Sequence, residues 1–266
     1  MYASPWLARF GHSGLTLEPV MPWQAPQTAA FCAPSAASPA EADPAIASEA
    51  RTHPNQLFFM QELYMSRYSE ARFLKSATSP SSFGDDSGYE VAIAGRSNSG
   101  KSSALNAIVR RNDLARTSRT PGRTQAVNLF ELQPGRRLVD LPGYGHAKVP
   151  DLVRVAWAEL MDAYFRERGS LAGLLIVVDA RRGFGASDEA MLAYAAARGV
   201  PSHVLLSKAD KLGRNEARRA LEAAREALAG RASAQLFSAK SGEGVDAAQR
   251  ALEAMLSGQA KVPGDP

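Results

Sequence analysis

Apolar residues along this chain form short unbroken runs, separated by segments in which they recur at helical spacing. Runs without alternation cover 90–94, 174–178 and 204–206, as is typical of strands buried on both faces of a parallel sheet. Helices are predicted over 103–109, 151–167, 215–229 and 245–256. Because strands alternate with helices, we predict an α/β fold: a mostly parallel six-stranded sheet with helices on both faces.

Three of the predicted helices have an apolar face that we expect to point into the core. The inward positions are Leu152, Ala156, Leu160 and Tyr164 in the first, Leu221, Ala224 and Leu228 in the second, and Val245, Leu252 and Met255 in the third. A further short helix is predicted over 56–68, and Phe73 and Leu74 would lead from it into the first strand.

Residues 1–54 differ in composition from the remainder. They are rich in Ala, Pro and Ser and have no apolar period, so we expect a disordered extension. A transit peptide is the rival interpretation, but Arg9 is the only basic residue before Arg51. We expect one domain over 55–258 and a short flexible tail over 259–266.

Composition narrows the function classes. The chain has 266 residues and a net charge of +4, a mild excess that permits a polyanionic partner without requiring one. A single cysteine, Cys32, excludes an internal disulfide and a multi-thiolate metal site. No apolar run is long enough to span a bilayer and no signal peptide is recognisable, so we expect a cytoplasmic protein without a membrane partner.

A phosphate-binding pattern lies between the first buried run and the first helix. It comprises Gly95, Arg96, Ser97, Asn98, Ser99, Gly100, Lys101 and Ser102, followed by Ser103. Glycines allow a tight turn in which successive N–H groups meet an anion, and the helix adds its positive end. Lys101 would reach the β- and γ-phosphates of a nucleotide, and the Ser102 hydroxyl is a hard oxygen ligand for Mg²⁺.

A second motif, Asp140, Leu141, Pro142 and Gly143, follows the apolar pair 138–139. Asp140 would therefore lie at the carboxyl end of a strand, where ligands bind in open α/β sheets. Its carboxylate can hold Mg²⁺ through water. Gly143 can bring its N–H against a γ-phosphate.

A third motif, Ser207, Lys208, Ala209 and Asp210, ends a later strand. Guanine presents two adjacent N–H donors that one carboxylate can accept, whereas adenine would leave that carboxylate unpaired. We therefore predict that Asp210 reads guanine and that the aliphatic stem of Lys208 lies along the base. Phe237, Ser238, Ala239 and Lys240 follow another strand and would offer backbone N–H groups to guanine O6.

Residues 116–125 form a long polar, turn-rich stretch that we expect to be a mobile loop. Thr124 could supply a second hydroxyl to Mg²⁺ when a γ-phosphate is present, and its loss on hydrolysis would release the loop. Thr120 is a competing candidate, and spacing does not separate the two.

The stretches 95–106, 117–125 and 140–145 closely resemble the bacterial EngB family of single-domain GTPases, which act in assembly of the large ribosomal subunit and in normal cell division. The resemblance covers about residues 70–257. It implies Ser102 and Thr124 as Mg²⁺ ligands, Lys208, Asp210, Ser238 and Ala239 as base contacts, and the large (50S) ribosomal subunit, with its RNA and proteins, as the partner of a monomer. With these, the expected nucleotide-binding set takes in the three motifs above and adds Gly122, Arg123, Thr124, Phe237, Ser238 and Ala239.

The chain departs from the family in two respects. The family usually has Thr where this chain has Ser207, and we expect a modest cost in nucleotide affinity without a change in base choice. Residues before about 50 have no counterpart in the family.

No catalytic residue can be assigned from the sequence. In well-studied GTPases a Gln just after the Asp-x-x-Gly motif orients the attacking water, but this chain has Tyr144 there. We therefore expect slow unassisted hydrolysis.

The alternative functions are a P-loop kinase that acts on a small metabolite and a scaffold whose nucleotide is not hydrolysed. The kinase would need an acceptor site and an Arg-bearing lid, neither of which is recognisable, and it would leave Asp210 without a role.

Several arginines are expected at the edge of the sheet that binds the nucleotide, and we predict that they contact ribosomal RNA. They are Arg110, Arg111, Arg116, Arg119, Arg123, Arg181 and Arg182.

Overall fold

The computed structural model describes residues 68, 70–115, 126–145 and 151–259, and only the backbone of residues 151–154. Seven strands form one sheet in the order β1-β3-β4-β2-β5-β6-β7. The strands are β1 (Arg72–Ala77), β2 (Tyr89–Gly95), β3 (Val127–Gln133), β4 (Arg136–Asp140), β5 (Leu171–Asp179), β6 (Ser202–Ser207) and β7 (Ser233–Leu236). Pairing is parallel from β4 to β7 and antiparallel for β1 with β3 and for β3 with β4.

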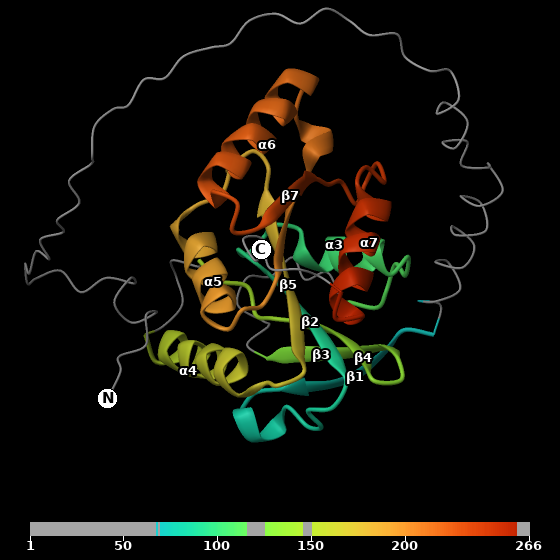
Figure 1. The fold of residues 1–266 in the computed structure, drawn as a ribbon, viewed down its shortest axis with the longest axis vertical. Coiled ribbons are helices and arrows are strands. Elements are labelled where there is room, and N and C mark those ends of the chain that lie inside the picture. The colour runs from blue at the N-terminus through green and yellow to red at the C-terminus, as the bar shows by residue number, and fades with distance from the viewer. Residues whose placement is uncertain (1–67, 69, 116–125, 146–150, 260–266) are drawn as a thin grey trace, which may run out of the picture.

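Helices cover both faces of this sheet, as predicted. They are α3 (Lys101–Ile108), α4 (Asp151–Glu167), α5 (Ala186–Ala197), α6 (Arg214–Leu228) and α7 (Val245–Leu256), with short 3-10 helices η1 (Pro80–Ser82) and η2 (Ala209–Lys211). In Figure 1, α3 and α7 lie to the right of the central strand β5, and α4 and α5 lie to its left. Among the helices that the structure describes, none has the length and apolarity needed to cross a membrane.

The central strands carry apolar side chains on both faces because successive side chains enter different cores. Val91 and Ile93 of β2 pack with α3 and α7, whereas Ala92 and Ala94 pack with α4, α5 and α6. The same division holds along β5: Leu175 packs with α3 and α7, whereas Leu174 and Ile176 belong to the core on the other face. This two-sided burial explains why these strands show no alternation in the sequence.

The predicted count of six strands was too low by one. The additional strand is β1, which pairs antiparallel with β3 at one edge of the sheet. Only Ala77 of this strand is buried, and Phe73 and Leu74 are 52% and 40% exposed. Because β1 is stabilised by backbone pairing more than by burial, it has no apolar run to mark it.

The helix predictions were mostly correct. Helix α4 has the predicted bounds, and Leu160 and Tyr164 are buried as expected, but Ala156 is exposed. Among the described side chains of α4 the first buried one is Ala158, where the helix packs against the sheet; the side chain of Leu152, also predicted to point inward, lies outside the described part. In α6, Ala224 and Leu228 are buried and Leu221 packs against the core; Val245, Leu252 and Met255 of α7 are all buried.

Two other regions were not resolved by the sequence patterns. Helix α5 was not predicted individually, because alanines dominate it and give a weak apolar period. Tyr68, the last residue of the predicted helix 56–68, is buried and donates a hydrogen bond to Glu253 of α7 at 2.8 Å. The remainder of that helix, residues 1–54 and most of the tail lie outside the described residues.

Candidate nucleotide-binding site

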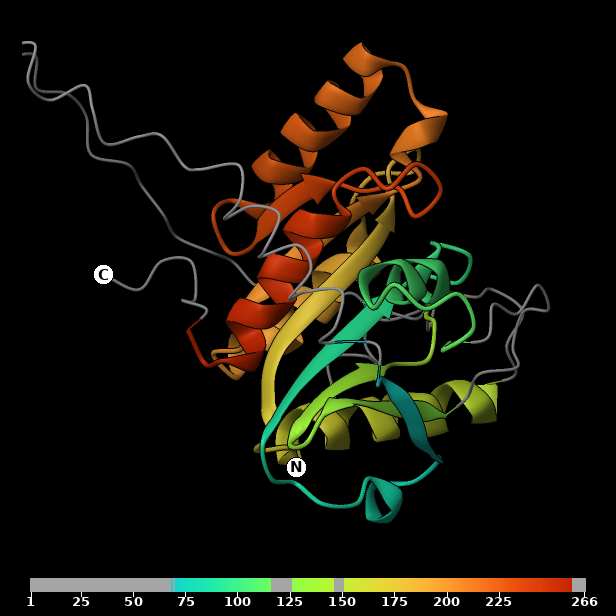
Figure 2. The ribbon, with the colours of Figure 1, turned by 90° about the vertical axis from the view of Figure 1, so that its right-hand side faces the viewer.

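The phosphate loop joins the end of β2 to the start of α3, as the sequence predicted, and Figure 2 shows the strand running into that helix. The loop turns back on itself, since the Ser99 N–H donates to the Arg96 carbonyl at 2.9 Å. Gly95 has no space for a side chain: a Cβ there would lie 2.6 Å from both Ser99 Oγ and the Val177 carbonyl oxygen. Arg96 to Gly100 therefore form a tight loop at the positive end of α3.

The structure brings Lys101 and Asp140 into direct contact. Asp140 ends β4, whose parallel register with β2 places it beside Ile93. The Lys101 ammonium forms an ion pair with the Asp140 carboxylate, and both side chains are largely buried. Ser102 lies in the first turn of α3, and within the described part of the chain its hydroxyl makes no hydrogen bond.

The segment after Asp140 lies directly against the phosphate loop. The Ser97 N–H donates to the Tyr144 carbonyl at 2.9 Å, and the Tyr144 N–H donates to the Gly95 carbonyl at 3.3 Å. Gly143 packs so closely that a Cβ on it would lie 3.1 Å from Ser97 Oγ. Leu141 continues the pairing with β2 through Ile93. The two phosphate motifs therefore share one backbone framework.

The third motif lies at the end of β6 and is bonded to the same loop. Ser207 Oγ lies 2.5 Å from the Ser99 carbonyl oxygen and 3.1 Å from that of Val178. The Lys208 ammonium donates to the Asn98 carbonyl at 2.6 Å. A serine hydroxyl is thus sufficient at position 207 to link β6 to the phosphate loop.

Asp210 is held by the loop that follows β7. Ser238 Oγ donates to Asp210 Oδ1 at 2.7 Å, and the Ala209 N–H donates to the Phe237 carbonyl at 3.1 Å. The hydrogen bond from Ser238 is the largest influence on the pKa of Asp210 and lowers it, so the carboxylate is ionised at neutral pH.

The set of backbone N–H groups that could donate to guanine O6 can be reduced to two. The Ser238 N–H already donates to the Glu243 carbonyl at 2.9 Å. Among the described residues, the N–H groups of Ala239 and Lys240 make no backbone hydrogen bond. These two groups are the ones that remain available to a ligand.

Arg96 has a role that the sequence did not reveal. Its guanidinium contacts Asp188 Oδ2 at 3.1 Å and the Gly183 carbonyl, so its side chain joins the phosphate loop to the start of α5. Asp188 is fully buried and also accepts hydrogen bonds from the Gly185 N–H and the Tyr144 hydroxyl, each at 2.9 Å. Burial is the largest influence on the pKa of Asp188 and raises it, although these partners act in the opposite direction.

Asp179 is a second acidic residue that the motif search missed. It ends β5, is 2% exposed, and contacts the Lys208 ammonium at 3.0 Å. Its position at the end of the apolar run 174–178 was the available signal. For Asp188, the signal was its place three residues after Gly185, which is that of a capping side chain.

Several predicted residues lie outside the described part of the chain. They are Gly122, Arg123, Thr124 and the alternative Thr120, together with Arg116 and Arg119 of the proposed RNA-contacting set. Of the remaining arginines, Arg110 pairs with Asp246 at 2.7 Å, Arg111 donates to the Ala71 carbonyl at 3.2 Å, and Arg181 pairs with Asp179 at 2.7 Å. These partners reduce the positive charge that the three arginines offer to RNA. Arg182 is exposed, and its guanidinium has no partner among the described residues.

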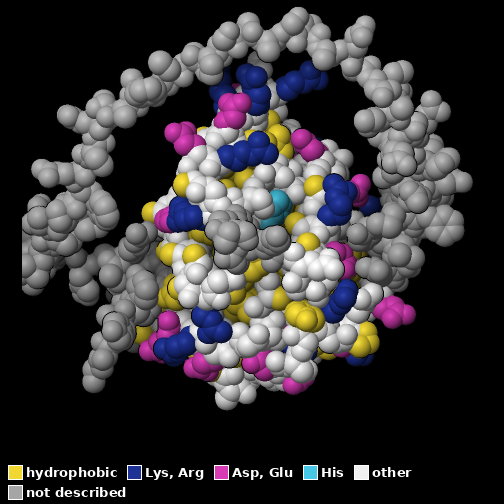
Figure 3. Space-filling view, viewed as in Figure 1, with side chains coloured by type: hydrophobic (Ala, Val, Ile, Leu, Met, Phe, Trp, Pro, Cys, Tyr) yellow, Lys and Arg dark blue, Asp and Glu magenta, His cyan; other side chains and the backbone are white. Residues whose placement is uncertain are grey.

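Positive charge also lies elsewhere on the surface. In Figure 3, Lys and Arg side chains gather over the top of the molecule, where α6 lies, with acidic side chains among them. The exposed residues of α6 include Arg214, Arg218, Arg219 and Arg225, but also Glu216, Glu222 and Glu226. This helix therefore presents a mixed surface rather than a basic patch.

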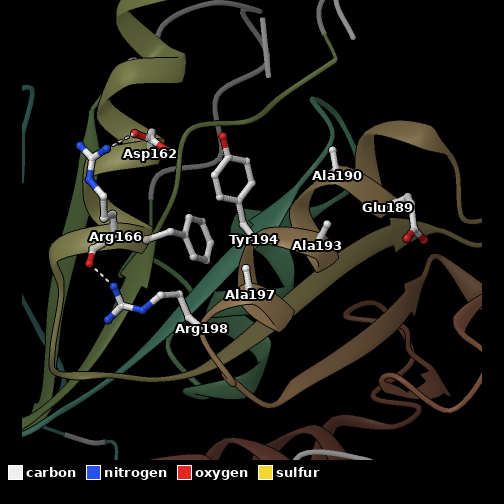
Figure 4. Close-up of a pocket in the computed structure, with 9 residues that line it drawn as sticks. Asp162, Arg166, Glu189, Ala190, Ala193, Tyr194, Ala197 and Arg198 are labelled. Atoms are coloured by element: carbon white, nitrogen blue, oxygen red, sulfur yellow. Dashed lines mark hydrogen bonds and ion pairs between the residues drawn. The ribbon is translucent and has the colours of Figure 1, made fainter. Parts of the chain in front are cut away.

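A groove of about 360 Å³ lies between α4 and α5 (Figure 4), and no residue of the phosphate loop lines it. Phe165 and Tyr194 stack within it at 5.5 Å between ring centroids, and three alanines of α5 line one wall. Its lining is mainly apolar and lacks the convergent N–H groups that phosphates need. The groove is therefore separate from the candidate site.

Comparisons with known proteins relate the chain to GTP-binding proteins. The family model described as "50S ribosome-binding GTPase" matches residues 90–208. The "Probable GTP-binding protein EngB" of Xanthomonas campestris (strain 8004) is 47% identical over 200 residues, which are 74% of this chain and 97% of the relative. The protein of the same name from Xylella fastidiosa (strain Temecula1) is 48% identical over 190 residues, which are 70% of this chain and 94% of that relative.

Solved structures show the same fold. The crystal structure of a probable GTP-binding protein engB has a TM-score of 0.52 at 19% identity and covers 63% of this chain and 98% of that one. Era, in complex with MgGDPNP and nucleotides of 16S ribosomal RNA, has a TM-score of 0.50 at 22% identity and covers 68% and 59%. The two sequence relatives, together with the family model, establish that the chain belongs to the EngB family of GTP-binding proteins and is a GTPase.

Proposed function

We propose that this GTPase is a switch that assists assembly of the large ribosomal subunit, and through it normal cell division, as a cytoplasmic monomer. The observation that supports it best is the physical connection between base-reading and phosphate-binding loops. Ser207 reaches the Ser99 carbonyl and Lys208 reaches the Asn98 carbonyl, at 2.5 and 2.6 Å. A guanine nucleotide would therefore meet one connected set of contacts from base to γ-phosphate.

At the phosphate end, we assign the Lys101 ammonium and the loop N–H groups of 96–102 to the phosphates, except those of Ser97 and Ser99, which donate to backbone carbonyls. Lys101 would exchange its present partner, Asp140, for the β- and γ-phosphate oxygens. Gly143 lies beside Ser97 and would direct its N–H toward the γ-phosphate. This arrangement places several donors around the charge that develops during hydrolysis.

The donor atoms around Lys101 fit Mg²⁺. The Ser102 hydroxyl and the Asp140 carboxylate are hard oxygen ligands, and the Ser102 hydroxyl has no hydrogen-bond partner within the described residues. Magnesium, when bound, would neutralise charge on the β- and γ-phosphates. We assign Ser102 as a direct ligand and Asp140 as a ligand through water, and we retain Thr124 as the second direct ligand on the family resemblance.

At the base end, we assign Asp210 to the two adjacent N–H donors of guanine. Ser238 fixes one oxygen of that carboxylate, which leaves the other and its lone pairs to the base. The stem of Lys208 would lie along the base plane, and the N–H of Ala239 or Lys240 would donate to O6. We further propose that the GTPase domain spans 55–258.

The experiment that tests the proposal is turnover of GTP and of ATP by the purified protein, each with and without 50S and 30S subunits. A ribosome-linked GTPase should hydrolyse GTP but not ATP. Its GTP turnover should be faster with 50S than with 30S subunits. A metabolite kinase would consume nucleotide only with its acceptor present, and a scaffold would bind GTP without turnover in any mixture. Equal rates with both subunits would contradict the assignment of the large subunit.

A further inference from the structure

Asp179 lies outside the nucleotide-binding motifs, yet it contacts the residue that supports the base. It ends β5, and its Cα is paired in parallel register with that of Ser207. Its side chain is almost completely buried, and its Oδ2 lies 3.0 Å from the Lys208 ammonium. Lys208 follows Ser207 directly, so the register of β5 with β6 determines this contact.

The Lys208 ammonium is held at two points. One is Asp179 Oδ2, and the other is the Asn98 carbonyl of the phosphate loop at 2.6 Å. Lys208 also has a left-handed backbone, with φ of 60°. A lysine side chain loses much rotamer freedom when it is ordered, so a second anchor on the ammonium reduces the ordering that a ligand must impose.

Arg181 orients the same carboxylate. Its Nε donates to Asp179 Oδ1 at 3.0 Å, and a terminal guanidinium nitrogen donates to Oδ2 at 2.7 Å. The backbone N–H of Arg181 also donates to Oδ1, at 3.1 Å. Burial by itself would raise the pKa of Asp179, but the hydrogen bonds from Arg181 and Lys208 outweigh it and hold the pKa well below its usual range. The carboxylate is thus charged and turned toward Lys208 at neutral pH.

We propose that Asp179 is a positioning residue for guanine-nucleotide binding, which acts by holding the Lys208 ammonium against the phosphate loop. The proposal rests on the proposed function, because contact between Lys208 and the base belongs to it. The proposal predicts that Asp179 acts only through Lys208, which would lie along the face of the base. Asp179 itself would not contact the hydrogen-bonding edge of the base. Its removal should therefore weaken binding of every purine diphosphate that Lys208 supports by the same factor.

A double-mutant cycle on the full chain tests this. Dissociation of a fluorescent GDP analogue is measured for wild type, Asp179→Asn, Lys208→Met and the double variant. Each single substitution should speed dissociation about tenfold, and the double variant should be no faster than Lys208→Met alone, since directly coupled residues are not additive. Additive effects of the two substitutions would overturn the proposal.

The matched control is Arg181→Ala, which removes the other cation from the same carboxylate. It should speed GDP dissociation less than Asp179→Asn does, because the backbone N–H at position 181 and the Lys208 ammonium still hold the carboxylate. If it speeds dissociation as much as Asp179→Asn does, Asp179 acts through Arg181 and the proposal is wrong. Asp179→Ser replaces Asp179→Asn in the cycle if the amide variant does not fold.

A second measurement distinguishes positioning from base reading and from general loss of structure. Inosine diphosphate lacks the N2 amino group from which Asp210 would accept a hydrogen bond. Asp179→Asn should weaken GDP and inosine diphosphate equally, whereas Asp210→Asn should change their ratio. A changed ratio in Asp179→Asn would overturn the positioning role, and a wild-type protein that binds neither nucleotide would overturn the proposed function with it.

Discussion

The Tyr144 hydroxyl donates a hydrogen bond to the buried carboxylate of Asp188 at 2.9 Å. Tyr144 is 3% exposed, and burial, the largest influence, raises its pKa well above 10, so the hydroxyl keeps its proton. The same carboxylate contacts Arg96 of the phosphate loop. The residue that follows the Asp-x-x-Gly motif is therefore a structural link between that motif, the phosphate loop and α5.

This link leads to a first prediction, that unassisted GTP hydrolysis is slow. A hydroxyl bonded within the core is not available to orient a water molecule at the γ-phosphate. We expect turnover of about 10⁻⁴ to 10⁻² per second, the range of GTPases without an activating partner. Single-turnover release of phosphate measures it, and a rate above roughly one per second would mean that this chain supplies its own catalytic group.

The second prediction separates structure from catalysis at the same residue. Tyr144→Phe leaves buried Asp188 without one of its donors, so we expect a loss of about 1–3 kcal/mol in unfolding free energy. The melting temperature should fall by about 2–4 °C per kcal/mol for a domain of this size. Tyr89→Phe, at an exposed tyrosine, is the control. Unassisted turnover should not change; a large fall in turnover at unchanged stability would contradict the structural role.

The sequence predicted best those features that are local. The phosphate loop, β2 and α3 adjoin one another in the chain, and Asp140 could be placed because parallel strands end at one edge of the sheet. The sequence did not predict those features that depend on contacts between elements far apart in the chain. β1 is stabilised by pairing with a strand some 50 residues away, and the inward face of α4 depends on how that helix meets the sheet.

The two acidic residues that reasoning from motifs missed illustrate the same limit. The positions of Asp179 and Asp188 indicate only the end of a strand and a helix cap, and each residue acquires its further role from a basic partner on another element, Lys208 and Arg96. Arg96 was expected among the nucleotide contacts, but its side chain is bound to Asp188. The Arg96 backbone N–H is therefore the group of this residue that we assign to phosphate.

The third prediction concerns base choice. The protein should bind GDP and GTP far more tightly than ADP or ATP, since an unpaired carboxylate in the bound complex costs about 1–3 kcal/mol or more. Asp210→Asn should then prefer xanthine nucleotides, because its amide can donate to the O2 atom of xanthine. Competition against a fluorescent GDP analogue measures both. Full guanine affinity in the variant would show that Asp210 does not read the base.

The fourth prediction is a dependence of stability on pH through His203. This ring is bonded to Ser233 and Gln235, at 2.7 and 2.9 Å, and burial, the largest influence, lowers its pKa below the usual 6.5. The folded protein then binds fewer protons than the unfolded chain, so stability should fall as the pH drops from about 6.5 through the folded-state pKa.

Denaturant unfolding at pH 7.5 and at pH 5.5 measures this effect. His203→Gln should lose less stability between the two pH values than wild type does, whatever its stability at pH 7.5. The other three histidines are common to both proteins and cancel in the comparison. Equal losses in the two proteins would show that His203 does not cause the dependence.

The last prediction concerns the ribosomal partner. Arg110, Arg111 and Arg181 are bonded within the protein, so the predicted RNA contact now rests on Arg182 and on the arginines of 116–125. Each contact with a phosphate should steepen the fall of affinity with salt, by up to about 0.9 in log–log slope on a duplex. Replacing Arg119 and Arg123 by Ala should therefore flatten the salt dependence of binding to 50S subunits, with free-nucleotide affinity nearly unchanged.

Cosedimentation with 50S subunits across a salt series in the GTP-bound form measures these slopes. Arg218→Ala combined with Arg219→Ala is the matched control, because it removes the same charge from the exposed, mixed surface of α6. This control should retain the wild-type slope. If it flattens the slope while the 119 and 123 double variant does not, the RNA is bound through α6, and the nucleotide edge is not the docking surface.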